Sequence, residues 1–243
     1  MAGASERSPG FLLPGMCDDF TPQLTTAELK KRAEQHHASL LEEGVELHPV
    51  INSTRKLASN FWGSAWMKQL AYCESGGMSL APGRSLLRHG CVLDLRITSC
   101  CIQALVSTQD LYEVQLKLQP LNPERLEQLA TTCGRHIESL LSLLEGKINA
   151  SVLQHLCHPE SGILPAPADW QMSCTCPDWT EPCPHAAAAI YAAGCLIDAS
   201  PALLFTLRGI SPADLLPPAK AEELDSATLS TQFGIDLELP GLH

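Results

Sequence analysis

The chain has 243 residues, of which 45% are hydrophobic and 18% are charged, and its formal net charge is −11 at pH 7. No apolar run reaches the roughly 20 residues that a transmembrane helix needs, and the acidic balance argues against a domain devoted mainly to binding nucleic acid. The chain does not start with a basic stretch followed by a sustained apolar one, so no cleaved signal is expected and a cytoplasmic location is predicted.

The first part of the chain predicts a flexible lead followed by two helices. Residues 1–24 contain Gly and Pro without periodicity and form the predicted lead. Thr25 and Glu28 have the spacing of a capping box, which predicts a helix over about 26–43. Apolar residues at helical spacing predict a second helix over 61–74.

The next segment changes to the two-residue period of β-strands. Apolar residues alternate with polar ones in three successive runs: Leu93, Leu95 and Ile97, then Ile102, Ala104 and Val106, then Tyr112, Val114, Leu116 and Leu118. This pattern predicts an antiparallel meander with one solvated face, in which Gln109 and Asp110 make a hairpin turn. Residues 25–120 are therefore predicted to form an α+β domain.

Residues 121–210 predict a helical region. A helix is expected from Asn122 to about Leu144, a short one over 149–156, and a proline-rich linker over 159–169. After a cysteine-rich segment, two further helices are expected over 186–198 and from 201 to 209. Residues 211–243 form the predicted acidic, partly flexible tail, whose Phe233–Leu239 segment is apolar enough to dock onto another surface.

The cysteine-rich segment carries the strongest chemical signal. Its pattern is CxC-x6-CxH, formed by Cys174, Cys176, Cys183 and His185, which we call the cysteine–histidine cluster. Cysteines separated by one residue can point to the same side of an extended strand. Thiolates and imidazole are the ligands that zinc prefers, and four protein ligands leave no open position for a reacting water. One structural zinc ion is therefore predicted in a finger over about 170–198.

Two other cysteine–histidine pairs offer alternative ligands. Cys133 with His136 lies on one predicted helix face, and Cys157 with His158 lies near a helix end. A core cysteine beside a surface histidine is the commoner explanation for the first pair, and the second pair is at most a weak second metal site. The other scattered cysteines lie mostly among apolar neighbours, and most of them are interpreted as small core residues. The chain has 11 cysteines, an odd number, so complete disulfide pairing is excluded.

The chain resembles prokaryotic SWIM zinc finger proteins found beside SNF2-type ATPases, over roughly residues 60–210. Phe61–Trp66 looks like their FWG-x-AW opening, and Pro82–Val92 is similar to their RGR-x-YAR-x-G-x-V stretch. Cys176–His185 matches CPDW-x-x-PCKH except at the lysine position, and Leu207–Gly209 matches LRG. The resemblance implies zinc binding and an interaction with DNA or protein, with a SNF2-type helicase or ATPase as a partner.

The sequence gives limited support for contacts with nucleic acid. The segment 61–120 is positive, with five Lys and Arg against four Asp and Glu, and Arg84, Arg88 and Arg96 are its candidate phosphate contacts. At three positions the chain departs from the SWIM pattern, and each change removes a contact to phosphate or base: Pro82, Leu87 and Pro184. Stacking on nucleic-acid bases is a minor hypothesis for three tryptophans, Trp62, Trp66 and Trp179.

The leading hypothesis is a non-enzymatic, zinc-stabilised accessory factor that contacts DNA, protein or both. The alternative is a protein adaptor that never touches DNA, which the acidic balance favours. An enzyme is the third class, but the chain has no GxSxG, P-loop, dinucleotide fingerprint or HExxH, and no small-molecule substrate is indicated. Cys100 and Cys101 are the remaining redox candidates, although vicinal cysteines in a strand usually face opposite sides.

Overall fold

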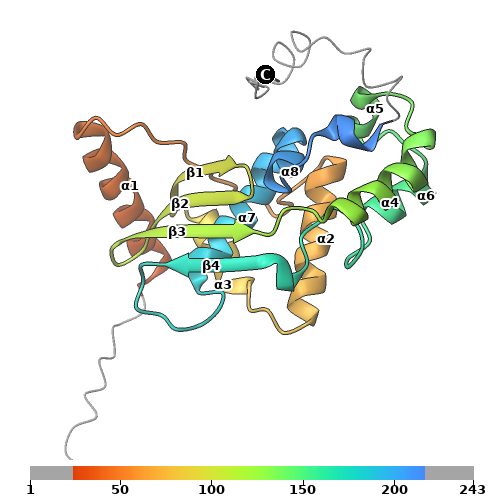
Figure 1. The fold of residues 1–243 in the computed structure, drawn as a ribbon. Coiled ribbons are helices and arrows are strands. Elements are labelled where there is room, and N and C mark those ends of the chain that lie inside the picture. The colour runs from red at the N-terminus through yellow and green to blue at the C-terminus, as the bar shows by residue number, and fades with distance from the viewer. Residues whose placement is uncertain (1–23, 217–243) are drawn as a thin grey trace, which may run out of the picture.

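The computed structural model describes residues 24–216, and the protein has an α+β fold built on one antiparallel sheet of four strands (Figure 1). The predicted lead, apart from residue 24, and the tail after residue 216 lie outside the described residues, and so does the Phe233–Leu239 segment. Within the described part of the chain, no helix is long and apolar enough to cross a membrane.

The sheet has the order β1-β2-β3-β4. The predicted meander is confirmed and supplies three of its strands: β1 (Val92–Thr98), β2 (Cys101–Ser107) and β3 (Leu111–Leu118). The fourth strand, β4 (Trp170–Cys174), was not predicted and pairs antiparallel with β3, with Cys174 opposite Val114. The adjacent cysteines Cys100 and Cys101 were expected in one strand. Cys100 instead lies in the two-residue β1–β2 turn, with a φ of 55°.

One face of the sheet is covered by α7 (Pro184–Ala199), which contacts all four strands (Figure 1). The other side of α7 contacts α2 (Phe61–Ser75) and α3 (Ala81–Arg88). A helix that is apolar on every side has to be buried on every side, and eleven residues of α7 are buried. Its small side chains allow close approach: a Cβ added to Gly83 of α3 would lie 2.3 Å from the backbone of Ala187.

The predicted helices at the N-terminal side are confirmed within one residue at each end. α1 (Thr26–Glu42) starts with the capping box that Thr25 and Glu28 predict. In α2, Trp62 and Trp66 are completely buried, and their indole N–H groups donate to backbone oxygens of Leu143 and Ile190. The base-stacking hypothesis is therefore wrong for these two tryptophans, and their interpretation as core residues is confirmed.

The helices that follow the meander in the sequence differ in one place from the prediction. The helix expected from Asn122 to Leu144 is two helices, α4 (Pro123–Cys133) and α5 (Leu140–Glu145). The chain leaves the helical conformation after Gly134–His136 because Ser139 takes an extended conformation and caps α5, accepting a hydrogen bond from the Ser142 amide. α6 (Ala150–Leu156) and α8 (Ala202–Leu207) lie close to their predicted positions.

A partly buried ion pair lies at the start of β4. Arg208, which follows α8, is 1% exposed and its guanidinium donates to Asp169 at 2.9 Å. The amide of Leu121 donates to the Arg208 carbonyl, so the same residue is also tied to the segment after β3. These contacts hold the strand that ends at Cys174.

Candidate metal centre

The four members of the cysteine–histidine cluster come from two elements that meet at one edge of the sheet. Cys174 is the last residue of β4, and Cys176 follows it two residues later. Cys183 is the N-cap of α7, and His185 lies in the first turn of that helix. Pro184 occupies the first helical position, where a missing amide proton costs nothing.

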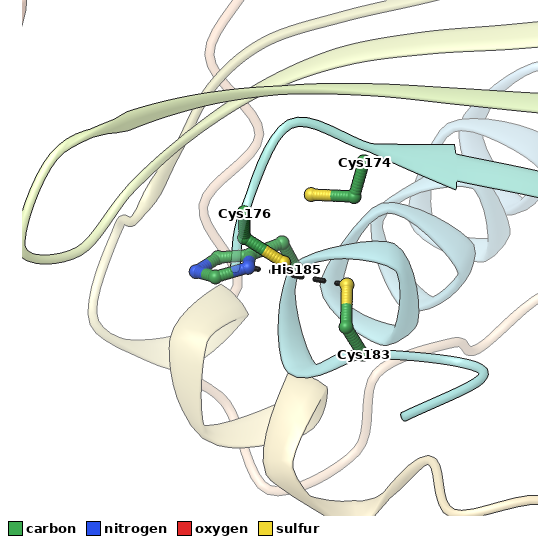
Figure 2. A group of neighbouring side chains, drawn as sticks. All are labelled: Cys174, Cys176, Cys183 and His185. Carbon is green, nitrogen blue, oxygen red and sulfur yellow. Dashed lines mark hydrogen bonds between the residues drawn. The ribbon is translucent and has the colours of Figure 1, made fainter. Parts of the chain in front are cut away.

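The donor atoms of the cluster all lie within 4.8 Å of one another. The Cys183 sulfur is 3.9 Å from Nδ1 of His185, and Figure 2 shows the side chains turned toward a common space between the end of β4 and the start of α7. Among the described residues, this is the one group of three or more His, Cys, Asp or Glu side chains placed to hold a metal ion. The four residues are therefore brought together as their spacing predicts, and they can hold a metal ion.

The extended backbone after β4 sets the two CxC thiols side by side. The amide of Thr175 donates to the Glu113 carbonyl at 3.1 Å, and the Glu113 amide donates to Oγ1 of Thr175 at 3.0 Å. The pairing with β3 thus continues one residue beyond the strand. Because side chains alternate along an extended chain, Cys174 and Cys176 share one side while Thr175 takes the other.

His185 is held by contacts that sequence reasoning did not find. Its Nε2 lies 2.9 Å from Oγ1 of Thr108, and its ring centroid lies 4.4 Å from that of Tyr112. Thr108 and Tyr112 lie at the β2–β3 hairpin, and no short motif marks either residue. With Nε2 turned to Thr108 and Nδ1 turned to the thiols, Nδ1 is the nitrogen available to a metal, and with a metal there Nε2 would carry the proton and donate it to the threonine oxygen.

Hydrogen bonds and burial shift the pKa values of the three thiols in the cluster. The pKa of Cys183 is lowered, chiefly because the Cys174 thiol donates a hydrogen bond to it, and also because of His185 and the Ala186 amide. The pKa of Cys174 is raised because its proton is held in that hydrogen bond and because it is partly buried. Burial also raises the pKa of Cys176. Of the three thiols, Cys183 is thus the one that loses its proton most readily, and its place at the N-terminus of α7 favours negative charge there.

The alternative ligand pairs do not gather into such a group. Cys133 is buried at the end of α4 while His136 is exposed, and neither Cys157 nor His158 joins a cluster of three metal-binding side chains among the described residues. Burial raises the pKa of Cys157 to about 12, so it stays a thiol at neutral pH. The core-and-surface interpretation of Cys133 and His136 is therefore confirmed.

The three candidate phosphate contacts are not one surface cluster. Arg84 and Arg88 lie one turn apart on α3, whereas Arg96 lies on β1. Arg84 donates to the hydroxyl of Tyr191 at 3.0 Å, and its guanidinium lies 4.9 Å from the centroid of that ring. Arg96 donates to Asp94 at 3.1 Å and to the Glu46 carbonyl at 2.9 Å. Two of the three arginines therefore already have partners within the chain.

Comparisons with known proteins identify a similar sequence. The chain is 26% identical over 180 residues to the uncharacterized protein Rv2102 of Mycobacterium tuberculosis, and the match covers 72% of this chain. The match spans 64% of the relative, less than two thirds of its length. No family model matches the chain, and no solved structure matches it significantly.

Proposed function

We propose that the chain is a SWIM-type interaction module that one structural zinc ion stabilises. The observation that carries this proposal is the convergence of Cys174, Cys176, Cys183 and His185, whose donor atoms lie within 4.8 Å of one another. The metal would hold a surface in shape for another macromolecule and would perform no reaction itself.

The donor set fits zinc better than other common metals. Three thiols and one imidazole suit zinc, whereas magnesium and calcium prefer oxygen ligands. On a zinc tetrahedron with bonds of about 2.0 to 2.3 Å, two sulfur ligands lie about 3.8 Å apart, and a sulfur and a nitrogen lie about 3.5 Å apart. The 3.9 Å between the Cys183 sulfur and Nδ1 of His185 is about 0.4 Å longer than the sulfur–nitrogen value, and this distance and the 4.8 Å upper limit require only side-chain adjustment. Four protein ligands leave no open position, which supports a structural role.

The acidic sequence on both sides of the cluster favours a protein as the interaction partner. No Lys or Arg occurs between Lys147 and Arg208, a span that contains the whole cluster and five acidic residues. A surface that grips nucleic acid needs positive charge facing the phosphates. The SNF2-type ATPase implied by the SWIM resemblance is our candidate partner. DNA contact through Arg84 and Arg88, which lie on the positive segment of the chain, is the second candidate.

A zinc assay and a DNA titration test the proposal together. We expect one zinc per chain after purification without chelator, and loss of that zinc in Cys183→Ala. Cys195→Ala is the matched control, because Cys195 lies on the same helix but outside the cluster. A full zinc content in Cys183→Ala, or none in the wild type, would contradict the proposal.

The DNA titration separates the two kinds of partner. Zinc-loaded chain is titrated against single- and double-stranded DNA at two salt concentrations. A protein adaptor shows no affinity at low salt, whereas a DNA-contacting factor shows affinity that falls steeply with salt. Salt-dependent binding that disappears in Cys183→Ala would replace the protein-adaptor proposal with the DNA-contacting one.

A further inference from the structure

The loop between the second and third cysteines of the cluster displays a fully exposed tryptophan. Trp179 is 99% exposed, more than any other large hydrophobic side chain in the described part of the chain. The other three tryptophans of the chain, Trp62, Trp66 and Trp170, are buried. Because an indole left in water contributes no apolar burial to the fold, the whole Trp179 side chain is available for burial by a partner.

The loop presents Trp179 from a constrained backbone. Both ends of the loop are ligands of the cluster, Cys176 and Cys183, so a bound metal fixes the ends in space. Inside the loop, the Thr180 amide donates to the Asp178 side chain at 2.9 Å. Two prolines in the loop, Pro177 and Pro182, further restrict the backbone. A residue held in place before binding loses less conformational entropy when it binds.

The charges around Trp179 select the kind of partner. Asp178 and Glu181 flank it in the loop, and no Lys or Arg lies within the 60 residues around it, 148–207. Stacking on a nucleic-acid base would bring these carboxylates toward phosphates, which repel them. Tryptophan is enriched among the residues that dominate protein–protein binding energy, typically as an anchor in a desolvated pocket.

We infer that the loop 177–182 docks onto a folded protein partner by inserting Trp179 into an apolar pocket bordered by Lys or Arg side chains. Asp178 and Glu181 face those basic side chains and steer the encounter. This inference rests on the proposed function, because the metal-bound cluster holds the loop in place. It adds the residue that anchors the complex and the chemistry of the surface that receives it.

Site-specific photo-crosslinking in the full chain identifies the partner. The photoreactive amino acid p-benzoylphenylalanine replaces Trp179, and in a control chain it replaces Tyr72, an exposed aromatic residue of α2. Irradiation of the cells that make the protein should trap a protein at position 179 and not at position 72. Mass spectrometry then locates the trapped segment, which should lie beside Lys or Arg residues. A crosslink to nucleic acid, or none, overturns the inference.

Binding measurements on the identified partner complete the test. We expect Trp179→Ala to weaken the affinity at least about tenfold, the effect of losing an interface anchor. The double variant Asp178→Asn, Glu181→Gln should bind more weakly at low salt and lose most of the salt dependence. A trapped protein that binds Trp179→Ala as tightly as the wild type overturns the inference.

Zinc content separates this inference from the proposed function. Trp179 is not a ligand, so Trp179→Ala should retain one zinc per chain and the thermal stability of the wild type. Normal zinc content with undiminished partner binding rejects only the docking site. Failure of the wild-type chain to bind zinc rejects the proposed function itself.

Discussion

The two ring nitrogens of His185 face different partners, and we expect Thr108 to act as a positioning residue for a metal bound at the cluster. Its hydroxyl lies 2.9 Å from Nε2, and that contact keeps Nδ1 turned toward the thiols. In Thr108→Val, the side chain keeps its shape but loses the acceptor. We expect metal affinity to fall about 10- to 100-fold, the usual effect of removing such a partner, while the fold is retained. Competition with a chromophoric zinc chelator measures the change.

Thr131→Val is the matched control for that substitution. Thr131 is an exposed residue of α4, outside the cluster, so the same chemical change there should leave zinc affinity as it is. Equal affinities for Thr108→Val and the wild type would mean that the histidine orientation does not depend on the threonine.

The thiol pKa values predict how metal binding responds to pH. The pKa of Cys174 and that of Cys176 are raised, so both thiols hold protons at neutral pH in the metal-free chain. Protons compete with the metal for these sulfurs, and binding releases them. Affinity should therefore fall as pH is lowered from 8 to 6, by about tenfold per displaced proton for each pH unit. Titrations at the two pH values that gave the same affinity would contradict this.

At the level of whole elements, local signals predicted most helices and three strands. Thr25 and Glu28 form reciprocal hydrogen bonds between side chain and backbone in the first turn of α1. The Asn122 side chain caps α4 by accepting a hydrogen bond from the Glu124 amide. These interactions span two or three residues, so a single sequence contains them in full. The cysteine–histidine cluster was predictable for the same reason, because its ligands lie within 12 residues of one another.

Elements that depend on distant partners escaped prediction. β4 has only five residues, and its place in the sheet comes from pairing with β3, more than 50 residues earlier in the chain. α3 carries Pro82 and Gly83, which resemble a loop until the helix is packed against α7. Thr108 reaches the metal centre only because the hairpin is folded next to the start of α7. Each case is decided by tertiary contact.

The contact between α3 and α7 leaves no space for a side chain at Gly83. A Cβ there would lie 2.3 Å from backbone atoms of Ala187 and Ala188, closer than any relaxed contact. Gly83→Ala should therefore push the two helices apart and destabilise the fold by about 1 to 3 kcal/mol or more. Gly76→Ala is the control, because the nearest atom to its added Cβ is 3.4 Å away. Urea unfolding of both variants measures the difference, and equal midpoints would refute the packing argument.

At the scale of the molecule, the cluster joins two elements that also meet through the core. β4 belongs to the sheet, while α7 packs across the sheet face and against α2 and α3 (Figure 1). The hydrophobic contacts of α7 involve its whole length, whereas the cluster involves only its first turn. A metal bound at the cluster would therefore act locally and close the edge where β4 ends, the loop begins and α7 starts.

Metal removal should consequently loosen this edge before it unfolds the whole protein. Structural zinc contributes up to about 10 kcal/mol where nothing else holds a segment, but here the core retains α7. We expect a chelator to lower the unfolding temperature of the wild type by about 10 °C and to have no effect on Cys183→Ser. Hydrogen exchange should accelerate in residues 170–185 and stay slow in β1, β2 and the second half of α7, because those regions are protected by core packing. Uniform acceleration across the sheet would instead mean that the metal supports the entire fold, and no acceleration anywhere would mean that the edge is stable without it.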